Sequence, residues 1–360
     1  MKTTVVFLVL GLLALSAAAQ STVAVGNCRP HLVSYETISD AINAATPNST
    51  VLVCPATYPE QVTITEPLTL RGLSLGGVNP VIAVPSGGLL SNLGAAVQLS
   101  VQSASGPVNI YNLTVDGEGS NFDCSPAGAS LSGIEYLGTS GSLVGVNVQN
   151  QNPGGCGIGI SLSGSPSVID TVNMRQSSVT NFDDIGISAT YDDFNIGFVV
   201  NLDGNRVSSA STSVYAGVYY EGPNGVVANE TITVSGQYGL MLENFFGRLT
   251  ARGNTVIGAG VGIRTGADLA RTTDIVGNIV AKSGVGIQVI SPGAGAMMQR
   301  NSISFSSVAA IDANCSELVL TKNNFIFYAP VGLANIPGEE VGQGNVFDFV
   351  PIETTPCLGR

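Results

Sequence analysis

The sequence is poor in charge and in several side chains on which catalytic and metal sites often depend. Its 360 residues include no tryptophan, five methionines and a single histidine, His31, and only 11% of them are charged. One histidine cannot supply a histidine-based metal site. The net charge of −12 makes nucleic acid and anionic membranes unexpected partners. It also repels an acidic polysaccharide unless a basic patch or a bridging cation intervenes.

Long apolar runs are absent after the N-terminus, so no membrane span is expected in the rest of the chain. At the N-terminus, residues 1–19 have the features of a signal peptide. Lys2 is followed by an apolar run at residues 5–15 and by small residues at 17–19. The apolar run is short for a membrane anchor. The sequence therefore predicts a protein that is secreted, or held in the periplasm or at the cell surface.

Glycine is abundant, at 45 residues, and it takes part in a repeat that runs through residues 205–333. Asparagine recurs every 23 to 25 residues, and a glycine–apolar pair recurs in step with it, with alanine replacing glycine once. The asparagines are Asn205, Asn229, Asn254, Asn278, Asn301 and Asn324. The pairs are Gly217-Val218, Gly239-Leu240, Gly262-Ile263, Gly286-Ile287, Ala310-Ile311 and Gly332-Leu333.

Apolar and polar residues alternate between these positions, as in Ile263-Arg264-Thr265, which is typical of β-strands. Each unit holds three short strands and three bends, and it lacks the helical segment of a leucine-rich repeat. A single unit cannot bury its apolar face, whereas stacked units form one continuous core. The sequence therefore predicts an all-β, single-stranded parallel β-helix. The repeated asparagines are interpreted as structural corner residues that bond to one another along the axis.

Three N-terminal segments strengthen this interpretation: residues 35–45 (YETISDAINAA), 54–64 (CPATYPEQVTI) and 68–72 (LTLRG). Together with the repeats, they resemble the right-handed parallel β-helix proteins of the pectin lyase-like superfamily over almost all of the mature chain. The resemblance implies a right-handed solenoid. Because that superfamily includes lyases, hydrolases, esterases, epimerases, adhesins and proteins without known activity, it does not imply one reaction.

Residues 20–360 are expected to form one domain without a linker. Residues 37–45 carry apolar residues at helical spacing between Thr37 and Pro47, which predicts a short helix that caps the open N-terminal end. We expect the N-terminal arm and cap at 20–47, coils from about 48 to 345, and a C-terminal cap and tail at 346–360. Longer spacings between Gly157 and Gly217 predict extra loops on one flank, where solenoids often carry function.

Six cysteines are present, an even number that favours disulfide bonds in an exported protein. Many pairings are open to six cysteines, and none of their spacings resembles a zinc site. The preferred set ties the N-terminal arm to the first strand, clips a loop between adjacent coils and fixes the C-terminal tail to a late coil. These expected bonds are Cys28–Cys54, Cys124–Cys156 and Cys315–Cys357.

The third strand of each unit brings a candidate acidic pair together. Counted from each repeat glycine, the next residue points inward and the fourth residue along points outward. This register places Glu221 beside Glu243 on adjacent coils, about 4.8 Å apart at the backbone. Tyr219 and Arg264 flank the pair. Two such carboxyl groups suit the acid and the nucleophile or base of a retaining glycosidase. Alternatively, they can hold a calcium ion, or they can be two solvated glutamates on a sheet face.

A second cluster of acidic and aromatic residues brackets one coil just before the longest interval. Such a cluster suits sugar or calcium binding on a loop. The alternative is a hydrated loop with its aromatic side chains turned inward. We expect Tyr191, Asp183 and Asp184 to contact substrate together with Tyr219. The cluster comprises Phe182, Asp183, Asp184, Tyr191, Asp192, Asp193 and Phe194.

The motifs of the known enzymes of the superfamily are largely missing. Residues 181–184 (NFDD) resemble the paired-aspartate segment of polygalacturonases, but the Gly-His-Gly and Arg-Ile-Lys motifs of that family are absent. Residues 57–60 (TYPE) resemble a segment of pectin methylesterases, without their later aspartate and arginine segments. No segment frames a lysine or arginine as in pectate lyases, and copper-binding β-helix proteins would have more histidine or methionine.

Two functional classes stay open on the sequence alone. The first is a protein that binds or degrades an extracellular polysaccharide, as a lyase or glycoside hydrolase. Glu221 and Glu243 would then be acid and base or nucleophile, Arg264 would stabilise developing negative charge, and Tyr219 would support a sugar ring. The second is a non-enzymatic surface, matrix or adhesion protein with the solenoid as a rigid scaffold. The acidic flank favours the first class, and the lack of tryptophan and of known motifs favours the second. No cofactor is expected besides calcium, and the oligomeric state is not indicated.

Overall fold

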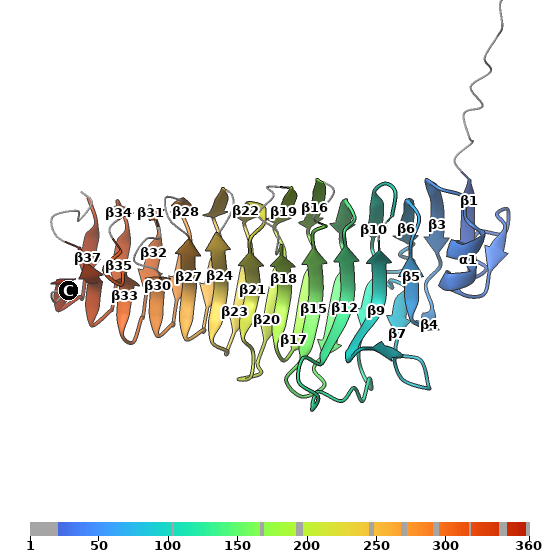
Figure 1. The fold of residues 1–360 in the computed structure, drawn as a ribbon, viewed down its shortest axis with the longest axis horizontal. Coiled ribbons are helices and arrows are strands. Elements are labelled where there is room, and N and C mark those ends of the chain that lie inside the picture. Colours follow the sequence, from blue (N-terminus) through green and yellow to red (C-terminus); the bar gives the residue numbers. More distant parts are fainter. Residues whose placement is uncertain are drawn as a thin grey trace, which may run out of the picture.

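A computed structural model describes most of the chain, and Figure 1 shows it as a long solenoid. The segment predicted to be a signal peptide lies outside the described residues, as do Asp192, Asp193 and Phe194. The described residues are 21–102, 104–165, 169–191, 197–244, 248–267, 272–290, 295–316, 318–337 and 344–357.

Three long sheets, here called A, B and C, receive one strand each from successive coils, and the chain passes from A to B to C in every coil. Sheet A contains, in spatial order, β2 (Ser34–Tyr35), β1 (Thr22–Val25), β3 (Ser49–Val53), β6 (Leu68–Gly72), β10 (Val108–Tyr111), β13 (Gly141–Val144), β16 (Asp170–Arg175), β19 (Phe198–Asp203), β22 (Asn224–Ala228), β25 (Leu249–Arg252), β28 (Thr272–Val276), β31 (Gly295–Gln299) and β34 (Leu318–Lys322).

Sheet B contains β4 (Thr57–Pro59), β7 (Val81–Ala83), β11 (Thr114–Asp116), β14 (Asn147–Gln151), β17 (Ser178–Phe182), β20 (Arg206–Ser209), β23 (Thr231–Val234), β26 (Thr255–Ile257), β29 (Ile279–Ala281), β32 (Ser302–Ser304), β35 (Phe325–Phe327) and β37 (Val346–Asp348).

Sheet C contains β5 (Val62–Ile64), β9 (Ala95–Gln102), β12 (Ser130–Leu137), β15 (Gly157–Ser163), β18 (Ile185–Thr190), β21 (Ala216–Glu221), β24 (Tyr238–Asn244), β27 (Val261–Ala267), β30 (Val285–Val289), β33 (Ala309–Asp312), β36 (Val331–Ile336) and β38 (Ile352–Pro356). Neighbouring strands of the three sheets run parallel, and the short strand β8 (Ser91–Asn92) pairs antiparallel with β9. The predicted parallel β-helix is therefore confirmed.

The capping helix is confirmed as α1 (Ile38–Ala44), which covers the N-terminal end of the solenoid (Figure 1). The Thr37 hydroxyl accepts a bond from the Asp40 backbone N–H at 3.0 Å, and the Glu60 carboxylate accepts one from the Ile38 N–H at 2.7 Å. These acceptors satisfy donors that a helix N-terminus leaves unpaired. Ile38 and Ala41 are buried against the first coils. No helix among the described residues has the length and apolar character needed to cross a membrane.

An asparagine ladder runs inside the corner between sheets A and B. Asn278 is fully buried, and its Oδ1 accepts bonds from the backbone N and the Nδ2 of Asn254 at 3.0 and 2.9 Å. Its Nδ2 donates to the Ala251 carbonyl and to Oδ1 of Asn301, each at 3.0 Å. The structural interpretation of the asparagines is therefore confirmed for this ladder.

The prediction is wrong for one asparagine of the series, Asn229. Asn229 has a φ of 57° and belongs to the residues that turn the corner, one position before the ladder. Glu230 takes the ladder position in that coil, because its backbone N–H donates to Oδ1 of Asn254 at 2.9 Å. Other coils have the same order, in which a left-handed residue directly precedes the ladder position. Gly253, for example, is left-handed and stands before Asn254. The ladder asparagines themselves point inward and do not supply the left-handed turn.

The repeat glycines of sheet C occupy positions with no room for a side chain. A Cβ at Gly262 would collide with Cγ1 of Val280 in sheet B and would lie 2.7 Å from the carbonyl oxygen of Gly286 in the next coil. The following residue, Ile263, is fully buried, as the register predicts. The glycine–apolar pair therefore marks the point where the backbone of sheet C packs directly against the core.

All three expected disulfide bonds are present: Cys28–Cys54, Cys124–Cys156 and Cys315–Cys357. The second bond joins the long connection before β12 to the connection before β15, on the flank between sheets B and C. The longer spacings between Gly157 and Gly217 include the connections from β15 to β16 and from β18 to β19, and both connections contain residues outside the described ones.

Candidate functional site

Strands β21 and β24 place the two predicted glutamates side by side on the outer face of sheet C. Glu221 is registered with Glu243, and Tyr219 with Met241. Arg264 follows on β27, registered with Met241. The alternation of the strands turns the intervening Tyr220 and Leu242 into the core, where both are fully buried. The predicted column of residues is therefore confirmed as a spatial arrangement.

Each glutamate has a close partner. The Tyr219 hydroxyl donates to Oε2 of Glu221 at 2.5 Å. Nη2 of Arg264 lies 3.6 Å from Oε1 of Glu243, and these two side chains are only 17% and 13% exposed. An ion pair with so little solvent access is screened less than one on an open surface. The cluster is therefore a partly buried polar network on the outer face of sheet C.

The electrostatics distinguish the Glu243 carboxyl group from that of a freely solvated glutamate. Burial raises the pKa of Glu243, the Arg264 guanidinium opposes this rise, and the Glu221 carboxylate adds to it. Burial and the bond to Glu221 also raise the pKa of Tyr219 well above its ordinary value. Glu243 therefore holds its proton to a higher pH than a solvated glutamate does, which is the property required of a general acid.

Two aromatic residues that the sequence analysis missed complete the cluster. The Arg264 guanidinium carbon lies 4.7 Å from the ring centroid of Tyr238. Tyr215 packs edge-on against Tyr238 at 5.4 Å and against Tyr219 at 6.0 Å. Burial raises the pKa of Tyr215, and the Arg264 guanidinium opposes this rise. Tyr238 stands directly before the repeat glycine Gly239, and strict alternation from the register would turn it inward. It lies on the outer face because Gly239 and Leu240 both face the core, which the sequence pattern did not indicate.

Arg264 is the central residue of this network. Its Nη1 lies 3.5 Å from the sulfur of Met241, while its buried Nε has no hydrogen-bond partner among the described residues. A buried guanidinium N–H without a partner is costly in free energy.

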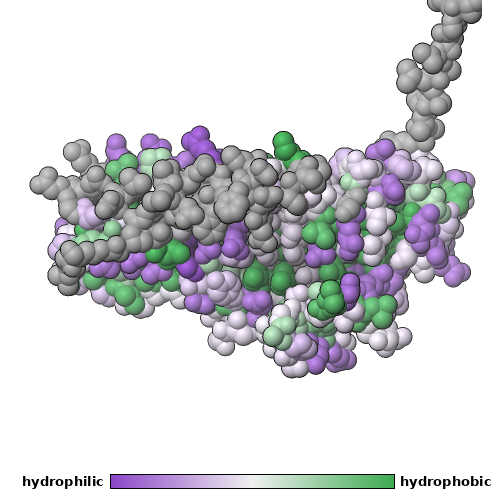
Figure 2. Space-filling model, viewed as in Figure 1, coloured by the Kyte–Doolittle hydropathy of each residue, from purple (hydrophilic) through white to green (hydrophobic). Residues whose placement is uncertain are grey.

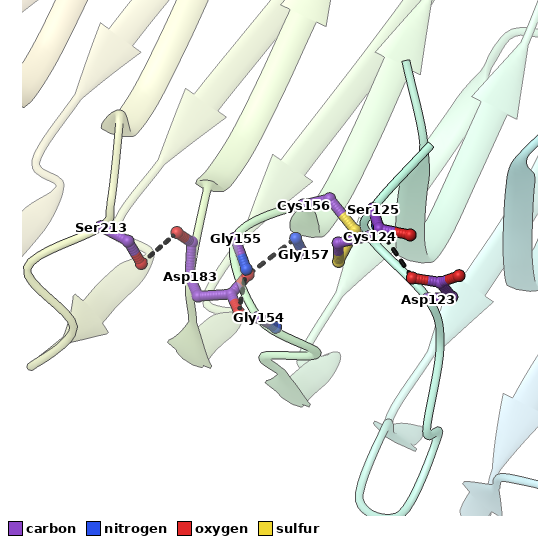
Figure 3. The surroundings of a disulfide bond; sticks show 9 residues. All are labelled: Asp123, Cys124, Ser125, Gly154, Gly155, Cys156, Gly157, Asp183 and Ser213. Carbon is purple, nitrogen blue, oxygen red and sulfur yellow. Dashed lines mark hydrogen bonds between the residues drawn. A yellow bond between two sulfur atoms is a disulfide. The ribbon is translucent and has the colours of Figure 1, made fainter. Parts of the chain in front are cut away.

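The second predicted cluster is divided between the two ends of β18. Asp183 precedes the strand and is 5% exposed, and its carboxylate accepts bonds from the backbone N–H groups of Gly154, Gly155 and Gly157 at 2.6, 2.7 and 2.7 Å (Figure 3). This geometry gives Asp183 a structural role in holding the loop that contains Cys156. Its predicted contact with substrate is not favoured by these bonds.

The other two predicted substrate contacts of this cluster, Asp184 and Tyr191, lie apart from each other. Asp184 is half-buried, and burial together with the neighbouring Asp183 charge raises its pKa to about 6. Tyr191 follows the far end of β18, is 5% exposed and packs its ring 6.1 Å from that of Phe198. The inward aromatic side chain matches the alternative stated for this cluster, and a substrate contact of Tyr191 stays a prediction without support from this geometry.

No group of three or more histidine, cysteine, aspartate and glutamate side chains is placed to hold a metal ion in the described part of the chain. The acidic pair itself consists of two carboxylates, one of which faces the Arg264 cation. A calcium ion at this pair stays a prediction that the positive charge of Arg264 disfavours.

The architecture just described is a right-handed parallel β-helix. Comparison with solved structures supports this. The A-module of the Azotobacter vinelandii mannuronan C-5 epimerase AlgE6 matches with a TM-score of 0.62 and 15% identity, over 88% of this chain and 89% of that one. The catalytic domain of a GH87 α-1,3-glucanase matches with a TM-score of 0.52 and 13% identity, over 91% and 68%.

The tailspike protein gp208, Dettilon, matches with a TM-score of 0.50 and 12% identity, over 84% of this chain and 62% of that one. No known family model matches the sequence. No curated protein matches it either. At these identities the likeness defines the fold, so the function has to be argued from the site.

Proposed function

We propose that this protein binds an extracellular polysaccharide on the outer face of sheet C and hydrolyses it at Glu221 and Glu243. One observation carries the proposal: the register between β21 and β24 pairs these two glutamates beside a partly buried arginine. Adjacent strands lie about 4.8 Å apart. That spacing agrees with the roughly 5 Å between the carboxyl groups of retaining glycosidases.

The environments of the two glutamates suggest their roles. Glu243, whose pKa is raised by burial, would donate its proton to the leaving oxygen of the glycosidic bond. The carboxylate that this leaves faces Arg264, which stabilises the new negative charge. Glu221 accepts the Tyr219 hydroxyl bond and would act as the nucleophile, which forms a covalent bond to the sugar that water then cleaves.

The similar structures support a carbohydrate substrate without identifying it. Two of them are named for acting on a polysaccharide, mannuronan in one case and α-1,3-glucan in the other. The strands of sheet C form one continuous row from β5 to β38 along the solenoid, a length that suits an extended chain (Figure 1). The three disulfide bonds fit an oxidising compartment, which supports export and with it an extracellular substrate.

The test is a polysaccharide degradation screen with four forms of the protein. Wild type, Glu221→Gln and Glu243→Gln are compared with Glu66→Gln, a control at an exposed glutamate on another part of the chain. New reducing ends in the products of wild type and the control, with a loss of about 10³-fold or more in both site variants, support the proposal. Equal activity of all four forms contradicts it. Products with a new ultraviolet absorbance would indicate elimination, and thus a lyase.

A second candidate function is a non-enzymatic scaffold that binds at the cell surface or in a matrix. The observation in its favour is that each glutamate already has an internal partner, Tyr219 for Glu221 and Arg264 for Glu243. If the pair serves only stability, Glu221→Gln and Glu243→Gln will lower the melting temperature, and no form will release reducing ends.

A further inference from the structure

A cavity of about 710 Å³ lies outside the acidic pair, on the flank between sheets B and C. Residues 84–94, here called loop 1, connect β7 to β9, and residues 117–129, loop 2, connect β11 to β12. Both project from the lower edge of the solenoid in Figure 1. A volume of this size is typical of small-molecule sites. The cavity is lined by Val84, Pro85, Ser86, Gly87, Gly88, Leu89, Ser91, Gly94, Glu118, Gly119, Ser120, Asn121, Phe122, Asp123 and Pro126.

Loop 1 is anchored by one side chain. Nε2 of Gln61 donates to the carbonyl oxygens of Leu90 and Val97 at 3.0 and 2.8 Å, and its Oε1 accepts a bond from the Leu90 N–H at 3.0 Å. This clamp connects loop 1 to the coil below it and to the start of β9. The first wall of the cavity is therefore held in place without any contribution from loop 2.

Loop 2 is anchored by the disulfide bond Cys124–Cys156 (Figure 3). Cys156 stands in the segment that the buried Asp183 carboxylate holds through three backbone bonds. Within loop 2, the Asp123 carboxylate accepts a bond from the Ser125 N–H at 2.9 Å. Two independently fixed walls make the cavity preformed, which lowers the entropy cost of binding.

The lining combines small polar residues with apolar surfaces. Glycines and serines expose backbone donors and acceptors, and Phe122 and two prolines supply flat apolar faces. Ser120, one of the lining residues, is only 9% exposed. Figure 2 shows the same mixture, because hydrophilic and hydrophobic residues are interspersed over the protruding lower edge. A sugar, with hydroxyl groups at its rim and C–H groups on its faces, matches this surface.

The charge of the lining restricts the ligand further. Its ionisable side chains are Glu118 and Asp123, and no lysine, arginine or histidine is among the lining residues. Hydrogen bonds with Ser125 lower the pKa of Asp123, so this carboxyl is ionised at neutral pH. An acidic sugar is therefore repelled here, both locally and by the net charge of −12.

We propose that this cavity is a second carbohydrate-binding site, which takes a non-acidic saccharide. It is separate from the acidic pair because β15 and β18 lie between β12 and β21 in sheet C. Three steps along the solenoid correspond to about 14 Å. The site needs no cleavage at Glu221 and Glu243, so it stands whether or not that pair is catalytic.

Isothermal titration calorimetry on the full, disulfide-bonded chain tests the proposal with three probes: cellohexaose, a chitosan hexamer and hexagalacturonate. Gly87 offers a cavity-filling position, because a Cβ there has no atom within 4 Å and its φ is not in the left-handed region. Gly87→Tyr should weaken binding of cellohexaose or the chitosan hexamer at least about tenfold in Kd. Gly87→Ala, the matched control, should bind as wild type does.

Two further variants distinguish this site from the acidic pair and from a folding defect. Glu243→Gln should keep full binding at the cavity even though it removes the proposed acid. Phe122→Ser provides a second test should Gly87→Tyr lower the melting temperature. Absence of binding by both non-acidic probes, stronger binding of hexagalacturonate, or unchanged binding in Gly87→Tyr and Phe122→Ser would overturn the proposal.

Discussion

Oε1 of Glu230 lies 3.0 Å from Nδ2 of Asn205 and 3.2 Å from its backbone nitrogen, deep inside the corner between sheets A and B. A carboxyl group thus takes the place that an amide occupies in the neighbouring coils. Its second oxygen, Oε2, is buried and has no hydrogen-bond partner among the described residues. In the asparagine ladder the corresponding atom is the amide nitrogen Nδ2, which donates hydrogen bonds. A carboxyl group can donate a hydrogen bond from this position only when it is protonated.

Glu230 should therefore make the stability of the protein depend on pH. Burial raises its pKa from 4.5 to about 7 in the folded protein. Folding takes up a proton in this window, so stability is greatest below about pH 4.5, falls as pH rises to about 7, and stays lower above it. The full difference is at most about 3 kcal/mol. Urea unfolding at pH 5 and pH 8 measures it.

Glu230→Gln is the matched variant, because it supplies an uncharged group of the same size with a donor in place of Oε2. We expect it to be more stable than wild type at pH 8 and to lose most of the wild-type decrease between the two pH values. Glu66→Gln, at an exposed position, should leave the decrease unchanged. A decrease of equal size in wild type and Glu230→Gln would show that Glu230 is not its source.

Asn278 should be among the most sensitive polar positions of the chain. Asn278→Ala removes the bonds to Asn254, Ala251 and Asn301 and leaves their donors and acceptors buried without partners. We expect a loss of about 2–4 kcal/mol in the free energy of unfolding. Asn229→Gly is the control, because Asn229 is on the exposed left-handed turn, where glycine is favoured. Its cost should stay below about 1 kcal/mol, and an equal cost for both variants would contradict the assignment of Asn229 to the turn.

The sequence was sufficient to predict features that depend on strict periodicity. The glycine–apolar pairs fix the register of sheet C, and that register is what placed Glu221 beside Glu243. The disulfide pairs were the preferred set among many pairings open to six cysteines, and the structure contains all three. Asn229 was assigned wrongly because the left-handed turn residue directly precedes the ladder position. In this coil the turn residue is asparagine and the ladder residue is Glu230, so the amide pattern pointed one residue too early.

Features built from non-repeating segments could not be predicted. Tyr215 precedes β21 in a connection whose path no period defines, and only the structure shows that it packs against Tyr219 and Tyr238. The cavity between loops 1 and 2 has the same origin, because both loops interrupt the repeat. Asp183 was predicted to contact substrate. Its three bonds to backbone N–H groups could not be predicted, because they depend on the course of the 154–157 segment.

Gly262 tests the explanation of the glycine column. Gly262→Ala would force a methyl group against Val280 and the Gly286 carbonyl oxygen, both in packed surroundings. We expect a loss of about 1–3 kcal/mol in the free energy of unfolding, as for other overpacked cores. Gly87→Ala, where the added methyl group meets no atom, should cost less than about 0.5 kcal/mol. Thermal or urea unfolding measures the stability of both variants. Equal stabilities would contradict the packing argument.

Arg264 should control both the rate and the pH dependence of the proposed hydrolysis. Its positive charge opposes the rise in the pKa of Glu243, so Arg264→Met should raise that pKa further. Because Glu243 acts as the acid only while it is protonated, the alkaline limb of the pH–rate profile should move to higher pH. The rate itself should fall about 10²–10³-fold, because the carboxylate that forms loses its neighbouring cation.

Arg248→Met is the matched control for this change. Arg248 also makes an ion pair at 3.6 Å, with Asp274, but its side chain is 86% exposed. Loss of an exposed pair of this kind has little effect. The control should therefore keep the wild-type profile. If the rate of Arg264→Met is too low to follow, carboxyl-carbon NMR titration of Glu243 reports the same shift directly. A lower pKa for Glu243 in Arg264→Met would contradict the role assigned to the arginine, because removing a nearby positive charge can only favour the protonated form.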